Sequence, residues 1–194
     1  MATFDRGFKS LAERTSANIR HELGLGAHDC LDVFKLAEFL DVKVCTPREI
    51  PGLPEEVIHQ LLIEDPFGWH AVSIVAPDGG VLLIYNPRKS PGRKVSDIAH
   101  ELAHILLEHK PSTVIFSHDA SFAMRTFDQK QEDEANWLAW SLLLPREALV
   151  RTTRQGMSIE QTAEFYKVTT QLVKYRLSVT GVSVQLARMR GRRG

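Results

Sequence analysis

Apolar and polar residues along the first half of the chain alternate with periods that predict helices followed by a small sheet. Apolar side chains at mixed spacings of three and four predict helices over 5–24, 30–40 and 54–63. Apolar residues alternate over 42–46, which predicts a short strand. The β-rich runs 71–76 and 81–85 flank the turn residues 77–80, a pattern typical of a β-hairpin.

The second half of the chain is predicted to be largely helical by the same criterion. The expected helices cover 91–109, 130–144, 159–166 and 169–179, with a brief helix or turn at 146–150. The mixed pattern of 111–128 predicts irregular structure. Ser158 and Gln161, three residues apart, form a helix-starting capping pattern. We expect an α+β fold with a small antiparallel sheet packed on helices. Its expected divisions are a domain over 1–150, a helix-turn-helix-like segment over 151–182 and a basic, flexible tail over 183–194.

Composition and charge narrow the function classes. The 194 residues are 43% hydrophobic and 25% charged, which is close to a globular average and excludes a disordered chain. The 24 basic and 24 acidic side chains balance, which excludes a uniformly basic nucleic-acid binder. The distribution is uneven, since residues 151–194 carry nine Lys or Arg and only two Glu. This asymmetry between the two parts of the chain is a first indication of function.

Cysteine usage and hydropathy favour a cytoplasmic protein. Cys30 and Cys45 are the only cysteines and form no CxxC motif, which excludes a disulfide framework and a cysteine-based zinc ribbon. The first residues lack the apolar core of a signal peptide. No apolar run reaches the roughly 18 residues that span a bilayer. We therefore expect no membrane partner.

The sequence His100-Glu101-Leu102-Ala103-His104 forms an HExxH motif within a predicted apolar helix. Residues i and i+4 share a helix face, so both imidazoles can reach one zinc ion with Zn–N distances of about 2.0–2.1 Å. Glu101 would lie beside the metal, where it can take a proton from zinc-bound water and pass it to a leaving amine. The alternative is a partly exposed amphipathic helix with incidental histidines.

A third ligand is needed, and the longer HExxHxxGxxH motif does not supply it. Leu107 stands at its glycine position and Lys110 at its last histidine position. His109 is one residue short of that position, and we expect it at the surface or beside a ligand rather than on the metal.

An acidic ligand from the helix over 130–144 is the remaining option. Glu132 and Asn136 are four residues apart and share a face, so the carboxylate can bind zinc while the amide supports a ligand. Glu134 projects in another direction and is expected to face solvent or a helix N-terminus. It remains the alternative ligand.

These motifs together resemble the ImmA/IrrE family of zinc metallopeptidases. The similarity covers about 25–180 and rests on the HExxH block, on Glu132-x-Glu134-Ala135-Asn136 and on Leu142-Leu143-Leu144-Pro145, preceded by Tyr85-Asn86-Pro87. It implies a minimal thermolysin-like zincin with one zinc per chain. Its ligands would be His100, His104 and Glu132, and Glu101 would be the catalytic acid/base. Relatives often have glycine at the position of Ala103, and the sensor-like C-terminal domain of some relatives does not fit in the remaining residues.

The segment 161–177 resembles a helix-turn-helix. Ala163 would pack between its two helices, Val168 would lie in the turn, and Val173 would face the core. The expected DNA-contacting residues on the second helix are Thr169, Thr170, Gln171 and Lys174, with Arg176 as a further basic group. The alternative is a packing module that closes the peptidase fold, and we expect DNA binding to be weak.

Other aromatic and histidine side chains are candidates for the stabilisation of an oxyanion. Tyr85, His70 and His118 could each donate a hydrogen bond there, and Tyr85 could equally be an aromatic at the edge of the core. The tryptophans, including Trp140, are expected in the core.

The HExxH motif predicts a zinc endopeptidase, and the resemblance to the ImmA/IrrE family implies that its substrate is a protein regulator, a helix-turn-helix repressor of the phage or mobile-element type. The alternative is a transcriptional regulator that binds DNA or a partner and has a structural or vestigial zinc site. Glu101 favours the peptidase, because a structural site needs no general base.

Overall fold

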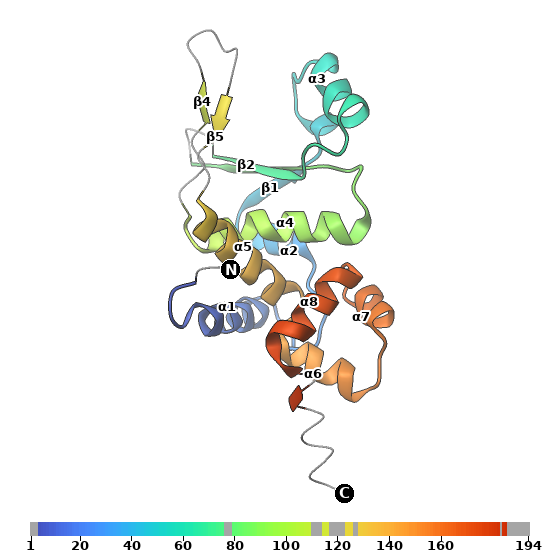
Figure 1. Cartoon of the computed structure of the whole chain (residues 1–194). Helices are drawn as coiled ribbons and strands as arrows, with labels where there is room; N and C mark the ends of the chain where they lie inside the picture. The colour runs from blue at the N-terminus through green and yellow to red at the C-terminus, as the bar shows by residue number, and fades with distance from the viewer. Residues whose placement is uncertain are drawn as a thin grey trace, which may run out of the picture.

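The computed structural model describes residues 4–75, 79–109, 114–116, 123–125, 128–182 and 184–185, and it has the predicted α+β architecture (Figure 1). Its helices are α1 (Phe8–Glu22), α2 (Val33–Phe39), α3 (Glu55–His59), α4 (Pro91–Leu106), α5 (Gln129–Leu143), α6 (Arg146–Arg154), α7 (Ile159–Phe165) and α8 (Thr170–Thr180). Its strands are β1 (Val42–Cys45), β2 (Ala71–Val75), β3 (Val81–Tyr85), β4 (Val114–Phe116) and β5 (Ala123–Arg125). A short 3-10 turn, η1 (Pro47–Glu49), follows β1, and a π-helical turn, η2 (Gln60–Glu64), extends α3.

The three-stranded sheet has the order β1-β3-β2. The predicted hairpin is present, since β2 and β3 pair antiparallel with Ser73 opposite Leu83. The prediction of a wholly antiparallel sheet was wrong, because β1 pairs parallel to β3 with Val44 opposite Leu83. The chain between these two strands passes through η1, α3, η2 and β2. That connection is long enough to bring the chain back to the end of the sheet at which β1 begins, as a parallel pair of strands requires.

The segment 111–128, predicted as irregular, contains the two strands β4 and β5, which pair antiparallel with Ile115 opposite Met124. Each strand is only three residues long. A run that short is too brief to show the period-two alternation by which a strand is recognised in a sequence.

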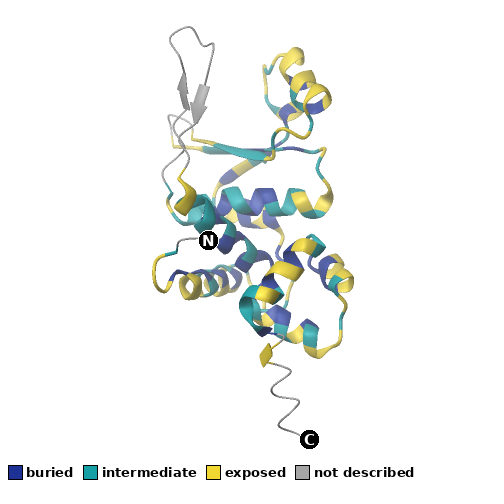
Figure 2. Cartoon of the chain, viewed as in Figure 1, coloured by how far each residue is buried: buried dark blue, intermediate teal, exposed yellow. Residues whose placement is uncertain are grey.

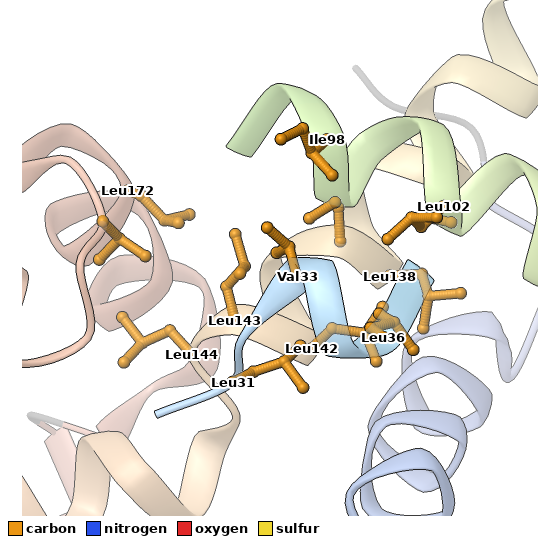
Figure 3. Close-up of a cluster of buried hydrophobic side chains, with 14 of the residues drawn as sticks. Leu31, Val33, Leu36, Ile98, Leu102, Leu138, Leu142, Leu143, Leu144 and Leu172 are labelled. Atoms are coloured by element: carbon orange, nitrogen blue, oxygen red, sulfur yellow. The ribbon is translucent and has the colours of Figure 1, made fainter. Parts of the chain in front are cut away.

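The core lies where α4 and α5 pack against each other, with the three-stranded sheet on one side of α4 and α1 packed on α5 (Figure 1). Figure 3 shows aliphatic side chains from α2, α4, α5 and α8 meeting there. Ile98 and Leu102 of α4 and Leu138 and Leu142 of α5 have no exposed surface. The inner faces of both helices are correspondingly buried in Figure 2. No helix among the described residues has the length and apolar character needed to cross a bilayer.

The helix-turn-helix-like segment packs into the same core rather than standing apart from it. Val173 is fully buried, Val168 lies in the turn and Ala163 packs between the helices, as predicted. The predicted capping pattern is present at α7, where Ser158 Oγ accepts a hydrogen bond from the Gln161 backbone.

Arg176 of α8 is buried with 1% of its surface exposed, which corrects its expected place among the DNA-facing basic residues. Its Nε donates to the Leu144 carbonyl at 3.0 Å, and its Nη2 donates to Glu13 Oε1 of α1 at 2.6 Å. The Arg176 guanidinium therefore fixes α8 to α1 and to the end of α5. Because it is buried in these contacts, it does not face the surface where DNA phosphates would bind.

Gly92, in the first turn of α4, lets the turn between α7 and α8 approach closely. A Cβ atom at this position would lie 2.8 Å from the carbonyl carbon of Val168 and 3.0 Å from the Thr169 nitrogen. Real Cβ atoms do not come that near to backbone, so only glycine accommodates this contact. The start of α8 is thereby held against the start of the helix that carries the HExxH motif.

Candidate metal centre

His100 and His104 lie on one face of α4, as their spacing predicts. Their Nε2 atoms are 3.1 Å apart, and the two rings meet edge to face with centroids separated by 4.7 Å. Ile98, Ala99, Leu102 and Ala103 on the opposite face are fully buried, which fixes the rotation of the helix. Both imidazoles therefore point out of the core and towards α5.

Glu132 projects from the first turn of α5 towards the two histidines. Asp128 caps this helix by accepting hydrogen bonds from the Lys130 and Gln131 backbone, so the start of α5 is locally defined. Glu132 Oε2 lies 3.2 Å from His100 Nε2, and Glu132 Oε1 lies 3.6 Å from His104 Nε2. The three side chains offer ligand atoms that all lie within 4.8 Å of one another, and such a group could hold a metal ion.

Glu101 lines the same cavity without belonging to this group of three. Ser73 Oγ on β2 donates a hydrogen bond of 2.7 Å to Glu101 Oε2, which ties the carboxylate to the sheet. The cavity has a volume of about 330 Å³ and is lined by residues of β2, α4 and α5, among them His100, Glu101 and Glu132. The Glu101 carboxylate and the possible metal ligands His100 and Glu132 thus face the same cavity.

His109 lies behind His104 and links it to Glu134. His109 Nδ1 is 3.0 Å from His104 Nδ1, and its Nε2 is 3.4 Å from Glu134 Oε2. Burial lowers the pKa of His109, although Glu134 opposes this effect. A neutral His109 that donates from Nε2 to Glu134 can accept a hydrogen bond from His104 Nδ1–H at its own Nδ1, and His104 then presents the unprotonated Nε2 that a metal ligand requires.

The geometry at the end of α4 brings His109 back to His104. Glu108 has a left-handed backbone with φ of 52°, and the His109 nitrogen donates to the His104 carbonyl at 3.0 Å. The Glu108 nitrogen donates to Ile105, which completes the paired hydrogen bonds of a Schellman motif. Of the two expected places for His109, the structure gives the one beside a ligand.

Glu134 does not face solvent, which corrects the expectation for it. Its side chain is only 13% exposed and lies between His109 and Lys130, whose Nζ is 4.0 Å from Glu134 Oε1. It lies outside the group formed by His100, His104 and Glu132. Of the two acidic candidates in α5, Glu132 is therefore the one brought to both histidines.

A second charged cluster lies one turn before the motif on α4. Asp97 is 7% exposed, and its Oδ1 is 2.8 Å from Arg93 Nε while its Oδ2 is 3.3 Å from His70 Nδ1. Burial raises the pKa of the Asp97 carboxyl, and the neighbouring Arg93 and His70 favour its ionised form. All three residues line the cavity, so His70, one of the predicted donors, does reach the site.

Residues 59–178 match the IrrE N-terminal-like domain family, Peptidase_M78. The chain belongs to this family. The match supports a metallopeptidase-like domain, and it spans the helix pair that holds His100, His104 and Glu132. No curated protein sequence matched the chain.

Among solved structures, the chain resembles a Mycobacterium tuberculosis transcriptional regulator with a TM-score of 0.51 and 18% sequence identity. The similarity covers 90% of this chain and 47% of the regulator, so the chain spans about half the length of that protein. At this level of identity, the similarity shows that the IrrE N-terminal-like chain and the matched part of the regulator share a fold.

Tyr85 is not among the residues that line the metal cavity, and its role as an oxyanion donor stays a prediction. Its ring packs edge to face on Phe34 of α2, with centroids 6.0 Å apart. Tyr85 pairs with Ala71, two residues along β2 from Ser73, which contacts Glu101. His118 lies outside the described residues.

The remaining predicted residues are distributed over two adjoining cavities. Asn136 lines the metal cavity one turn after Glu132, where its support of a ligand stays a prediction. Thr169 and Gln171 line a second cavity of about 430 Å³ between α4, α5 and α8. Thr170 is half-buried and Lys174 is exposed, and DNA contact by these four residues stays a prediction.

Sequence reasoning missed Ser73 and the Asp97 cluster as parts of the site. Ser73 is the one hydroxyl in the apolar strand β2, and such a residue is a signal for a polar partner across the sheet. Asp97 lies four residues before Glu101, on the same helix face, and that spacing was available in the sequence.

Proposed function

We propose that the chain is a zinc-dependent endopeptidase that cleaves a protein regulator of the helix-turn-helix repressor class. The observation that carries this proposal is the position of Glu101. Its carboxylate faces the cavity shared with His100 and Glu132, yet it is held by Ser73 rather than placed among the ligand atoms. A purely structural metal site has no use for such a carboxylate.

The donor set fits zinc in both chemistry and spacing. Two histidines and one glutamate are the ligands of a common catalytic zinc site, which keeps a fourth position open. Donors around a tetrahedral ion at about 2.1 Å lie about 3.4 Å from one another. The measured separations are 3.1 Å between the Nε2 atoms, and 3.2 Å and 3.6 Å from these atoms to Glu132. Zinc can therefore be held by His100, His104 and Glu132 with little rearrangement.

Bound zinc would supply Lewis acidity at the scissile carbonyl. Glu101 would take the proton from the attacking water and deliver it to the leaving amine as the peptide bond breaks. Ser73 keeps the Glu101 carboxylate in place by donating to Oε2, which leaves Oε1 available for that proton. The contacts of His109 with His104 and Glu134 support the His104 tautomer that would present Nε2 to the metal.

The sheet offers a place for the substrate backbone beside these groups. Strand β2 lies at the edge of the three-stranded sheet, and its residues Ala71 and Ser73 border the metal cavity and Glu101. An extended peptide can add to such an edge through main-chain hydrogen bonds. This arrangement favours an unfolded or extended segment of a protein as the substrate.

The test uses the full chain loaded with one equivalent of zinc and a helix-turn-helix repressor encoded beside its gene. We expect new fragments in mass spectrometry with a single main cleavage site, and no fragments with Glu101→Gln at equal zinc content. Cleavage by Glu101→Gln at the wild-type rate would contradict the role of Glu101. A repressor that the wild-type chain binds without cutting would favour the regulator alternative.

A further inference from the structure

The cavity between α4, α5 and α8 continues directly from the metal cavity. The two share three lining residues, Arg93, Ser96 and Trp140. We infer that this second cavity is a substrate subsite that takes a large apolar side chain of the polypeptide being cleaved. The inference rests on the proposed peptidase function and assigns to α8 a role in substrate choice.

The inner surface of this subsite is apolar and aromatic. Trp140 of α5 and Tyr175 of α8 meet edge to face, with ring centroids 4.6 Å apart, and Leu172 lies beside them. Tyr175 is 38% exposed, so an aromatic side chain is open to a ligand at this point of the lining. A cavity of about 430 Å³ has room for a phenyl or leucyl side chain together with part of its backbone.

Three polar groups of the lining are already engaged within the protein, whereas Gln171 stands exposed at the rim. Arg93 Nε is paired with Asp97 Oδ1 at 2.8 Å, and Ser96 Oγ donates to the Gly92 carbonyl at 3.0 Å. Thr169 Oγ1 accepts from the Leu172 nitrogen at 3.2 Å. A charged ligand side chain would have to break these three contacts to use the same atoms, whereas an apolar side chain leaves them intact. The inner part of the lining therefore favours an apolar side chain.

The cavity is also preformed. Gly92 lets the turn before α8 lie against α4, and the buried Arg176 fixes α8 to Glu13 and Leu144. Both walls are thus held in place without a ligand. A preformed pocket loses little conformational entropy when it is filled, which favours affinity.

The rise of α4 and α5 per residue gives the distance between the subsite and the scissile bond. Ser96 lies one turn, about 6 Å, from His100, and Trp140 lies two turns, about 12 Å, from Glu132. An extended peptide advances about 3.4 Å per residue. The side chain in the subsite therefore belongs to a residue about two to four positions from the bond that is cut.

Selection from a random decapeptide library tests this inference without requiring turnover. The bait is the full, zinc-loaded chain with Glu101→Gln, and bound peptides are sequenced. We expect enrichment of about tenfold for Phe, Tyr, Trp or Leu at one position. Tyr175→Ala in the bait should remove most of this enrichment and Tyr175→Phe should keep it. Phe39→Ala is the matched control and should leave the enrichment unchanged, because Phe39 is an exposed aromatic at the end of α2, with 47% of its surface exposed against 38% for Tyr175.

A second variant guards against a misfolded bait. Gln171 is an exposed residue at the rim, and Gln171→Glu should add an enrichment for Lys or Arg next to the apolar position. Absence of apolar enrichment, or enrichment that survives Tyr175→Ala, overturns the subsite. The enriched peptides are then offered to the wild-type chain, which should cut them two to four residues from the apolar position. Peptides that bind with Tyr175 dependence but are not cut overturn the peptidase proposal and leave a peptide-binding pocket.

Discussion

The hydroxyl of Ser73 donates to Glu101 Oε2 at 2.7 Å and joins the edge strand β2 to the HExxH helix. This hydrogen bond to a carboxylate holds the proposed acid/base in one orientation. In Ser73→Ala we expect kcat for peptide cleavage to fall about 10- to 150-fold with little change in KM, because a hydrogen bond to a charged group contributes about 1.5–3 kcal/mol. Ser73→Thr keeps the hydroxyl and should retain most of the rate. Wild-type kcat in Ser73→Ala, at equal zinc content, would contradict this role.

The contact between His109 and His104 predicts a loss of metal affinity when it is removed. We expect His109→Phe to weaken zinc binding about 10–100-fold, as is typical when a hydrogen bond that orients a ligand is lost. Competition with a chromophoric chelator measures this directly and needs no substrate. His21→Phe changes a histidine whose side chain is 88% exposed and should bind zinc normally. Equal affinities for both variants would remove His109 from the support of the site.

The pair formed by buried Arg176 and part-buried Glu13 predicts an effect on stability. Arg176→Met removes the hydrogen bonds of the guanidinium to the Glu13 carboxylate, whose side chain is 29% exposed, and to the Leu144 carbonyl, and the loss of a hydrogen bond to a charged group costs about 1.5–3 kcal/mol. Urea denaturation followed by circular dichroism should show a matching fall in the free energy of unfolding. Lys174→Met on the exposed side of the same helix should change it by less than about 0.5 kcal/mol. Similar losses in the two variants would argue against a special contribution from Arg176.

Gly92→Ala is expected to destabilise the protein by about 1–3 kcal/mol because the added Cβ overpacks the contact with Val168. Alanine is intrinsically the better helix former by about 1 kcal/mol, so propensity alone predicts the opposite sign. A thermal melt therefore decides between the two effects. An increase in melting temperature would show that the turn between α7 and α8 yields easily.

The sequence was sufficient for the parts of the site that depend on local periodicity. An apolar face every three or four residues places α4, and the i, i+4 relation then places His100 and His104 together. The same spacing on α5 favoured Glu132, and the structure brings it to both histidines. These relations lie within single helices, whose geometry is fixed by the backbone.

Contacts that depend on a reversal of the backbone, or on elements far apart in the chain, could not be predicted from the sequence. His109 reaches His104 because Glu108 adopts a left-handed conformation, which a sequence signals clearly only when glycine stands there. Ser73 and Glu101 are 28 residues apart and meet only once the sheet is placed on α4. Arg176 looked like a surface base because its partner, Glu13, lies 163 residues away.

That separation has a consequence for the rate of folding. The contact between Glu13 and Arg176 joins α1 to α8 across 163 residues of chain. Contacts of such long sequence separation form slowly, because the intervening chain must first be closed into a loop. Apolar side chains that become buried only when α8 joins the core, such as Leu172 and Val173, therefore stay exposed for longer during folding.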